Sequence, residues 1–233
     1  MNSRKMGRRK AMAVMGGAGA ALAFACGDSP TAPDAATTQT TTTTTTGTNA
    51  ACAVTPSETA GPYPSLVNLF RSDVREDRQG TQLTLNIKVV NTSAGCVPVP
   101  NANVEIWHCD AAGTYSEYGT ARTANFLRGI QTTNSSGEVT FTTIYPGWYQ
   151  GRATHIRLDV EINGVSRKVT QIAFPESINN TVHTSGVYAS KGTNPTSNAA
   201  DGIFADSLAA ELITPAGSVS GGYVATCQVA LAV

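Results

Sequence analysis

One short segment of this 233-residue chain places an ionisable side chain at every second position. They are His155, Arg157, Asp159 and Glu161, and the residues between them are all aliphatic. Such alternation predicts a β-strand, because successive side chains of a strand point to opposite faces of the sheet. The aliphatic face packs into a core, so the ionisable face is either solvated or lines a functional site. A solvated face is the more common outcome for a strand of this kind.

Five further segments alternate in the same way and are expected to be strands. They are residues 81–90, 104–109, 138–145, 169–174 and 222–233. Turn-forming Gly, Asn, Ser and Pro separate them, and no long stretch has the periodicity of an amphipathic helix. We therefore expect an all-β fold, a β-sandwich with long loops, and short helices at residues 65–77 and 205–212.

Longer motifs follow one another between these strands. They lie at residues 55–63 (TPSETAGPY), 100–110 (PNANVEIWHCD), 113–116 (GTYS), 126–131 (FLRGIQ), 137–141 (GEVTF), 144–156 (IYPGWYQGRATHI) and 170–171 (TQ). In order and spacing they resemble the intradiol ring-cleavage dioxygenases, particularly the secreted relatives of catechol and protocatechuate dioxygenases. The resemblance extends over residues 55–204, which is most of the part of the chain that can fold.

The resemblance implies a non-haem Fe(III) site held by two tyrosinates and two histidines. Matched motif by motif, the tyrosines fall on Tyr115 and Tyr149 and the first histidine on His155. The family also has an arginine and a glutamine that stabilise charge on the aromatic intermediate, and these fall on Arg152 and Gln171. The implied reaction uses O2 to cleave a catechol-like ring between its two hydroxyl-bearing carbons, giving a muconate-type diacid.

The family's second histidine falls on Arg157, and this is the main departure from the pattern. A guanidinium has no acceptor lone pair and stays protonated, so it cannot replace an imidazole as a ligand. Three arrangements are open. The three remaining ligands and water hold the iron while Arg157 swings outwards; or Asp159, His108 or His183 completes the shell; or iron is lost and Arg157 pairs with an anion or a tyrosinate.

Several other aromatic and histidine residues have ordinary structural interpretations. Tyr63 and Tyr145 are expected to be structural or to line a pocket, and Trp107 to lie in the core. His108 is expected to be a hydrogen-bonded structural histidine. His183 lies in a polar segment, so we expect it to be exposed.

The N-terminal quarter of the chain is expected to be a signal peptide followed by a linker. Residues 1–25 have five Lys or Arg, no acid, and then a short apolar run, which is typical of a signal peptide. Cys26 follows Ala-Phe-Ala and is a lipidation candidate. The alternative is ordinary cleavage of the signal peptide without lipidation. The Arg8-Arg9 pair is also compatible with twin-arginine export. Residues 26–50 form a Thr-rich linker that cannot build a core. The domain proper is residues 51–233.

Charge and cysteine content limit what this domain does. Beyond the signal the chain has more acidic than basic residues, which excludes nucleic acid as a partner. Charged residues are 14% of the chain, too few for a coiled coil or for disorder throughout. In an oxidising compartment its cysteines favour two disulfides of unspecified pairing, among Cys52, Cys96, Cys109 and Cys227.

These observations lead to one expected function and one alternative. We expect an exported dioxygenase, either membrane-anchored through Cys26 or free in the periplasm or outside the cell. It would act on a small aromatic diol with O2 and non-haem Fe(III), as a homodimer where it follows the family. The alternative is a family member without activity that serves as a surface β-sandwich binding module, because residues 97–104 and 132–147 also resemble carboxypeptidase-regulatory-like adhesion domains.

Overall fold

The computed structural model describes residues 52–233. The expected export signal, Cys26 and the Thr-rich linker lie outside the described residues. The strands are β1 (Gln82–Asn91), β2 (Val97–Pro98), β3 (Asn103–Trp107), β4 (Arg128–Thr132), β5 (Glu138–Ile144), β6 (His155–Ile162), β7 (Val165–Ala173), β8 (Ala216–Ser218) and β9 (Gly222–Leu231). The α-helices are α1 (Glu176–His183) and α2 (Leu208–Glu211), and short 3-10 helices are η2 (Thr92–Ala94), η3 (Gly119–Ala121), η4 (Gly186–Tyr188) and η5 (Asn198–Ala200).

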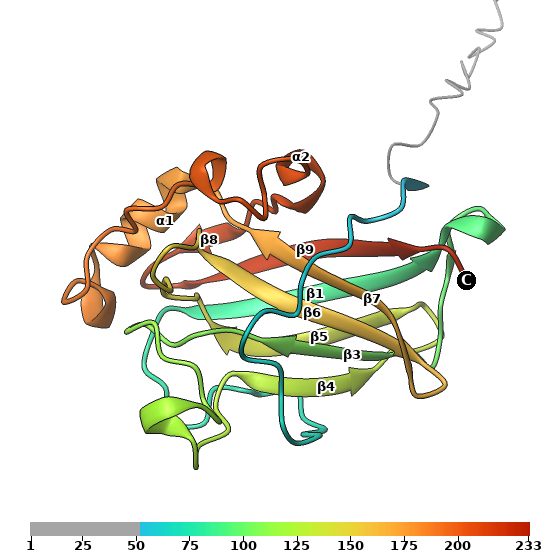
Figure 1. The fold of residues 1–233 in the computed structure, drawn as a ribbon, viewed down its shortest axis with the longest axis horizontal. Coiled ribbons are helices and arrows are strands. Elements are labelled where there is room, and N and C mark those ends of the chain that lie inside the picture. Colours follow the sequence, from blue (N-terminus) through green and yellow to red (C-terminus); the bar gives the residue numbers. More distant parts are fainter. Residues whose placement is uncertain (1–51) are drawn as a thin grey trace, which may run out of the picture. The chain divides into compact units, whose positions relative to one another are not determined.

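The strands form two sheets that pack face to face (Figure 1). One sheet has the order β2-β1-β9-β8, with β5 also paired to β1; the other has the order β4-β3-β6-β7. All pairings are antiparallel except that of β1 with β9. Helices α1 and α2 follow β7 and lie together beside the sandwich (Figure 1). The expected all-β sandwich is confirmed.

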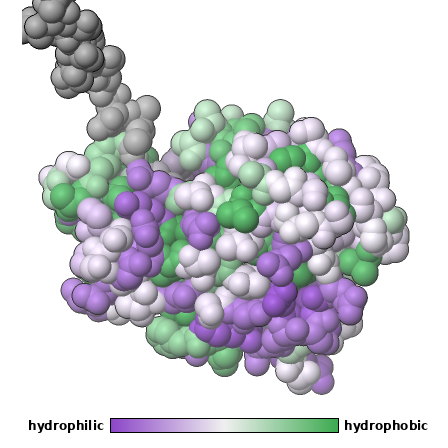
Figure 2. Space-filling view, turned by 180° about the vertical axis from the view of Figure 1, so that it is seen from behind, coloured by the Kyte–Doolittle hydropathy of each residue, from purple (hydrophilic) through white to green (hydrophobic). Residues whose placement is uncertain are grey.

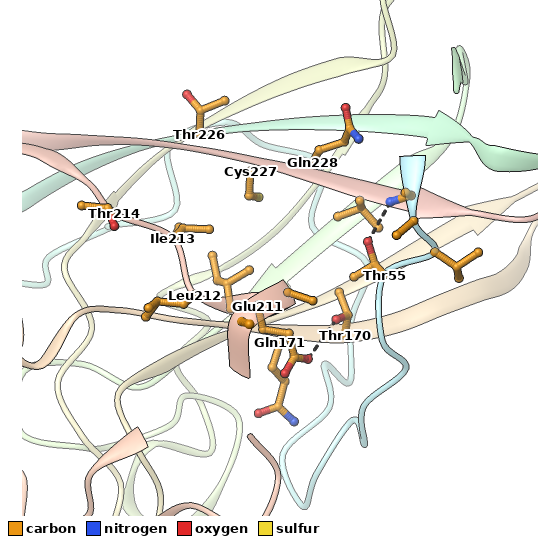
Figure 3. A pocket seen from close by; sticks show the side chains of 17 residues that line it. Thr55, Thr170, Gln171, Glu211, Leu212, Ile213, Thr214, Thr226, Cys227 and Gln228 are labelled. Carbon is orange, nitrogen blue, oxygen red and sulfur yellow. Dashed lines mark hydrogen bonds between the residues drawn. The ribbon is translucent and has the colours of Figure 1, made fainter. Parts of the chain in front are cut away.

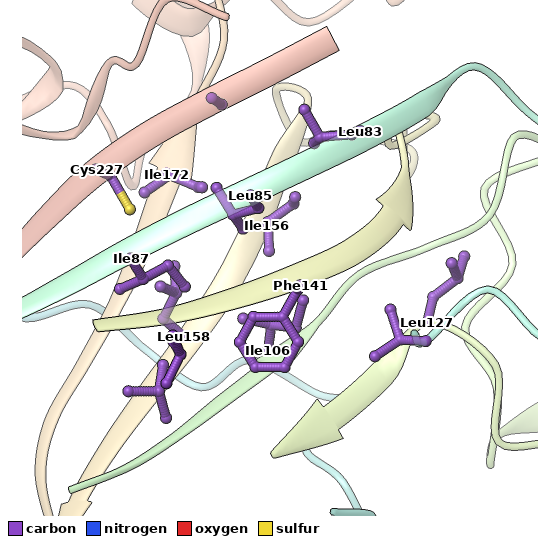
Figure 4. Packing of buried hydrophobic residues seen from close by; sticks show 14 of the residues in the cluster. Leu83, Leu85, Ile87, Ile106, Leu127, Phe141, Ile156, Leu158, Ile172 and Cys227 are labelled. Atoms are coloured by element: carbon purple, nitrogen blue, oxygen red, sulfur yellow. The ribbon is translucent and has the colours of Figure 1, made fainter. Parts of the chain in front are cut away.

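Alternation along the strands builds the core between the two sheets. Leu83, Leu85 and Ile87 of β1 point inwards, and Ile156 and Leu158 of β6 meet them from the other sheet (Figure 4). Each of these side chains is 0–1% exposed. Because a strand buries every second residue, the neighbours of these residues in β6 point to the outer face of the four-stranded sheet.

Two expectations about helices have different outcomes. The short helix expected within residues 205–212 is present as α2. The helix expected at residues 65–77 is wrong: that segment is extended, and Arg71 and Val74 donate backbone hydrogen bonds to β4 and β5. Pairing with strand edges satisfies the backbone there, so the segment has no need of helical hydrogen bonds.

In the part of the chain that the structure describes, one disulfide forms instead of two. Cys52 and Cys96 are bonded, with their Cα atoms 5.6 Å apart. Cys109 and Cys227 are free, buried thiols, so the expectation that they pair is wrong. Cys227 lies in the core between the sheets, whereas Cys109 packs in a separate cluster with Trp107. Residues in different clusters on opposite faces of a sheet cannot meet the short separation that a disulfide requires.

The described surface carries scattered apolar groups. On the face that Figure 2 shows, hydrophobic side chains are interspersed with hydrophilic ones, which form a broad area over part of it. Leu66 and Phe70, in the extended segment before β1, are 65% and 63% exposed. Within residues 52–233, none of the helices combines the length and the hydrophobicity that a membrane span requires.

Candidate active site

The ionisable face of β6 is covered by the chain that precedes β1. His155 and Arg157 are 2% and 3% exposed, so the expectation of a solvated face is wrong for this end of the strand. The covering segment includes Glu58, whose amide donates to the carbonyl of Val169 on β7 at 2.8 Å. Next to it, the carbonyl of Thr59 accepts hydrogen bonds from β6 and β7 side chains. The outer face of the sheet is therefore covered at this end of β6 and forms one wall of the site.

Two loops bring tyrosines over this wall. Tyr115 follows β3 in a turn that the Asp110 carboxylate organises, accepting from the amide of Thr114 at 2.9 Å. Tyr149 lies in the loop before β6. Gly147 lets the two loops approach closely, since a Cβ there would lie 2.3 Å from the carbonyl oxygen of Asp110.

Three tyrosine rings gather at this point. Tyr63, from the covering segment, stacks on Tyr115 with ring centroids 4.8 Å apart. Tyr149 meets both rings edge-on, at 5.4 Å from Tyr63 and 5.8 Å from Tyr115. The hydroxyls of Tyr63 and Tyr149 share a hydrogen bond of 2.7 Å. The sequence predicts Tyr63 only as a structural or pocket-lining residue, and the structure places it at the centre of the cluster.

His155 presents an acceptor nitrogen to this cluster. Its Nδ1 lies 2.7 Å from the carbonyl oxygen of Ala153, so Nδ1 carries the proton and Nε2 keeps its lone pair. Nε2 is 3.2 Å from the hydroxyl of Tyr115. Burial lowers the pKa of His155 well below its ordinary value, and the charges of Arg152 and Arg157 add to the effect. The ring is therefore neutral, which is the form that binds a metal ion.

Tyr115 holds its proton firmly in this environment. Burial raises the pKa of its phenol, because the phenolate loses contact with water. The Arg157 guanidinium acts against this shift through its charge and a hydrogen bond to the phenol, which lower the pKa. A bound cation would act in the same direction and more strongly, so this phenol is suited to ionise only when a cation is present.

Arg157 is held inside the site. Its Nη1 donates to the carbonyl oxygen of Thr59 at 2.7 Å, while Nε has no partner among the described residues. Gly61 lies against the guanidinium: a Cβ there would be 2.5 Å from Arg157 Cζ. In this structure Arg157 is therefore turned into the site under the covering segment, and the choice among the three arrangements of the iron shell stays a prediction.

The residues considered as replacement ligands lie elsewhere. Asp159 accepts from Ser166 at 2.6 Å and has no contact with the tyrosines. His108 bonds through its ring nitrogens to the Cys109 carbonyl and to Thr143, and burial lowers its pKa to about 4, which confirms a structural histidine. His183 is 1% exposed at the end of α1, so the expectation that it is exposed is wrong. Packing of α1 against the sandwich buries it.

A second network stands beside the tyrosines. Arg152 donates from Nη2 to Gln171 Oε1 at 2.8 Å and from Nε to Asp201 Oδ2 at 2.8 Å. Gln171 in turn donates to the carbonyl of Thr59 at 2.9 Å. Asp201 is fully buried and was not singled out from the sequence. It lies 49 residues beyond Arg152 in a loop with no motif, so its contact with Arg152 could not be predicted from neighbouring residues.

Two cavities lie near these groups. One of about 430 Å³ is lined by Tyr63, Tyr115, Tyr149, Arg152 and Arg157, together with neighbouring loop residues, and its size suits a small aromatic ligand. The other, of about 420 Å³, lies between α2, β7 and β9 (Figure 3). Its walls include Glu211 and Gln171 but none of the three tyrosines. The first cavity is the one that the site residues enclose.

The donors in the first cavity suit a hard cation. Among residues 52–233, no cluster of three or more His, Cys, Asp or Glu side chains is arranged to bind a metal ion. Here the donors are phenol oxygens and the free Nε2 of His155, and the separations within the pairs Tyr63–Tyr149 and Tyr115–His155 are 2.7 and 3.2 Å. Phenolate oxygens are hard anionic ligands that ferric iron favours. The phenol and imidazole donors fit Fe(III), whereas the guanidiniums of Arg152 and Arg157 beside them cannot bind a metal.

The fold and the site together define a β-sandwich protein with a buried phenol and imidazole cluster flanked by two arginines. A family model described as "Dioxygenase" matches residues 64–192, more than half of the chain. An intradiol ring-cleavage dioxygenase from Tetranychus urticae is 30% identical, with a TM-score of 0.72 over 78% of this chain and 95% of that one. This chain belongs to the intradiol dioxygenase family.

Two further relatives are similar at lower identity. The dioxygenase domain of a carbohydrate-binding fusion protein from a cellulolytic Streptomyces is 26% identical, with a TM-score of 0.59 over 78% of this chain and 99% of that one. A catechol 1,2-dioxygenase from Acinetobacter baylyi is 29% identical over 144 residues, which are 51% of this chain and 45% of that protein. The chain thus spans less than half the length of this curated relative.

Proposed function

We propose that this chain is an exported dioxygenase that uses non-haem Fe(III) and O2 to cleave catechol-like rings to muconate-type diacids. The observation that carries the proposal is that Tyr115 and Tyr149 line one cavity beside Arg152, and that the Tyr115 hydroxyl lies 3.2 Å from His155 Nε2. Tyr115, Tyr149 and His155 would hold the iron. When bound, ferric iron would draw electron density from a catechol-like ligand and so make its ring reactive towards O2.

The protein groups around the cavity have separate tasks in this reaction. Arg152 forms part of the cavity wall, where its charge stabilises negative charge that develops on the ring. Gln171 and Asp201 hold the Arg152 guanidinium from two sides, which fixes the direction of that charge. The Tyr149 hydroxyl lies at the cavity and shares a hydrogen bond with that of Tyr63. As a tyrosinate, Tyr149 would be able to take up a proton that a diol releases on binding.

Export and membrane attachment are part of the proposal. The Cys52–Cys96 disulfide is typical of a protein that folds in an oxidising compartment, and it supports export by the N-terminal signal. A lipid on Cys26 would tether the domain through the Thr-rich linker. A homodimer, which is common in the family, completes the proposal.

The alternative is a family member that no longer binds iron and serves as a binding module. The observation that favours it is the buried guanidinium of Arg157, which stands where the family has a ligand. The two functions differ in whether iron is bound, because a binding module has no need of it.

Iron content and the visible spectrum separate these functions. The purified protein, loaded with ferric iron, should show a tyrosinate-to-iron band that shifts when catechol is added, followed by O2 uptake and a muconate product. Tyr149→Phe should weaken the band, because it removes one of the tyrosinates, and it should lose most of the activity. Tyr223→Phe is the control, because Tyr223 packs on Tyr145 in the core between the sheets. A protein that stays colourless and iron-free after loading would refute the proposal.

A further inference from the structure

The site has a third phenol that the family's ligand set does not use. The Tyr63 hydroxyl lies 2.7 Å from that of Tyr149, and its ring stacks on Tyr115 at 4.8 Å. Tyr63 comes from the segment that covers β6, and that segment also covers Arg157 through Thr59 and Gly61. The phenol and the guanidinium therefore enter the site from the same side.

The spacing of these groups matches that of neighbouring ligands around one ion. Ligands at right angles, each about 2.0–2.1 Å from an octahedral ion, stand about 2.9 Å apart. The hydroxyls of Tyr63 and Tyr149 are 2.7 Å apart, and the Tyr115 hydroxyl is 3.2 Å from His155 Nε2. Each pair by itself thus has about the separation of adjacent ligands on one ion. The other residues considered as a fourth ligand are bonded elsewhere.

Charge gives a second, independent argument. Two phenolates and two neutral histidines around Fe(III) leave one net positive charge. A third phenolate in place of a histidine would reduce that charge to zero. A guanidinium beside this phenolate would restore the net charge of the site to one positive charge. Arg157 is such a group: it is 3% exposed, and its Nη1 donates to the carbonyl oxygen of Thr59 at 2.7 Å. Without an anion beside it, a buried cation of this kind would be costly.

We propose that Tyr63 supplies the fourth protein ligand of the ferric ion, as a third tyrosinate, and that Arg157 compensates its charge. The proposal rests on the proposed function, since it concerns the same iron. It explains in one step why the histidine position carries an arginine and why a third phenol stands beside Tyr149. The proton of each phenol that binds passes to solvent, and no redox step is involved.

The test compares ferric-ion affinity and spectrum in the full-length protein, independently of turnover. Tyr63→Phe should lower the ferric affinity, measured by chelator competition, by at least about tenfold. It should also reduce the tyrosinate-to-iron band by about one third, because two of three phenolates remain, and remove one set of tyrosinate modes from the resonance Raman spectrum. Tyr118→Phe is the matched control, since its ring also packs on Tyr63 but its hydroxyl donates to the Pro64 carbonyl.

A double variant tests the charge argument. Tyr63→Phe combined with Arg157→His rebuilds two phenolates and two histidines, and it should recover the affinity that Tyr63→Phe loses. If Tyr63→Phe keeps the affinity and spectrum of Tyr118→Phe, or if the double variant recovers nothing, this inference is wrong while the proposed function stands. If the unaltered protein binds no ferric iron, the proposed function fails first.

Discussion

Replacing Asp201 by Asn should both destabilise the protein and disorder the candidate site. Asp201 Oδ2 accepts from Arg152 Nε at 2.8 Å and from the Ala153 amide at 2.5 Å, while Oδ1 accepts from the Ile203 amide at 2.8 Å. All three partners are donors, so both oxygens are needed. An asparagine has one oxygen and one donating nitrogen, and it leaves at least one donor facing another donor.

The loss of stability in Asp201→Asn follows from the number of donors to Asp201 and from the burial of its side chain. A buried donor left without an acceptor costs about 1–3 kcal/mol, and breaking a buried ion pair costs about 3–5 kcal/mol. The Asp201 side chain is fully buried, but that of Arg152 is 16% exposed and keeps its bond to Gln171. We therefore expect Asp201→Asn to lower the free energy of unfolding by about 2–3 kcal/mol, or the melting temperature by about 5–10 °C.

Urea unfolding, followed by circular dichroism, measures this free energy directly. The matched control is Asp77→Asn, which breaks an Asp–Arg pair with Arg78 of 2.6 Å whose carboxylate is 74% exposed. That variant should leave the free energy of unfolding almost unchanged, because an exposed ion pair contributes little to stability. In the iron-loaded protein, Asp201→Asn should also slow ring cleavage with little loss of bound iron, since it acts through Arg152. Equal unfolding free energies for the two variants would refute the reasoning.

Two further predictions concern the covering segment and the second cavity. Gly61→Ala should destabilise the protein more than Gly164→Ala: both glycines have positive φ, +69° and +71°, but only at Gly61 does a Cβ meet a guanidinium, at 2.5 Å. Equal melting temperatures for these variants would mean that Arg157 is not packed under the segment. Burial raises the pKa of Glu211 to about 7, so the folded state favours its proton and stability should fall as pH rises from 4.5 to 7. Glu211→Gln should remove about 2 kcal/mol of that fall. The measurement is the urea midpoint of both proteins between pH 5 and 8. A midpoint that falls with pH as steeply in the variant as in the unaltered protein would contradict this.

Local pattern was enough to predict the strands and the family. Alternation along β1, β5, β6 and β9 was readable because a strand repeats every two residues, whatever it packs against. The motifs placed Tyr115, Tyr149 and His155 together before any geometry was known. Those predictions rest on neighbours in the chain, where spacing alone carries the information.

Contacts between distant segments were not readable in this way. Tyr63 and Tyr149 are 86 residues apart, and Arg152 and Asp201 are 49 apart, yet each pair is bonded. The burial of the ionisable face of β6 and the surroundings of Arg157 both depend on the segment that folds back over the outer face of the sheet. Such placement is set by the summed burial and hydrogen bonding of the whole domain, and no single stretch of sequence contains that sum.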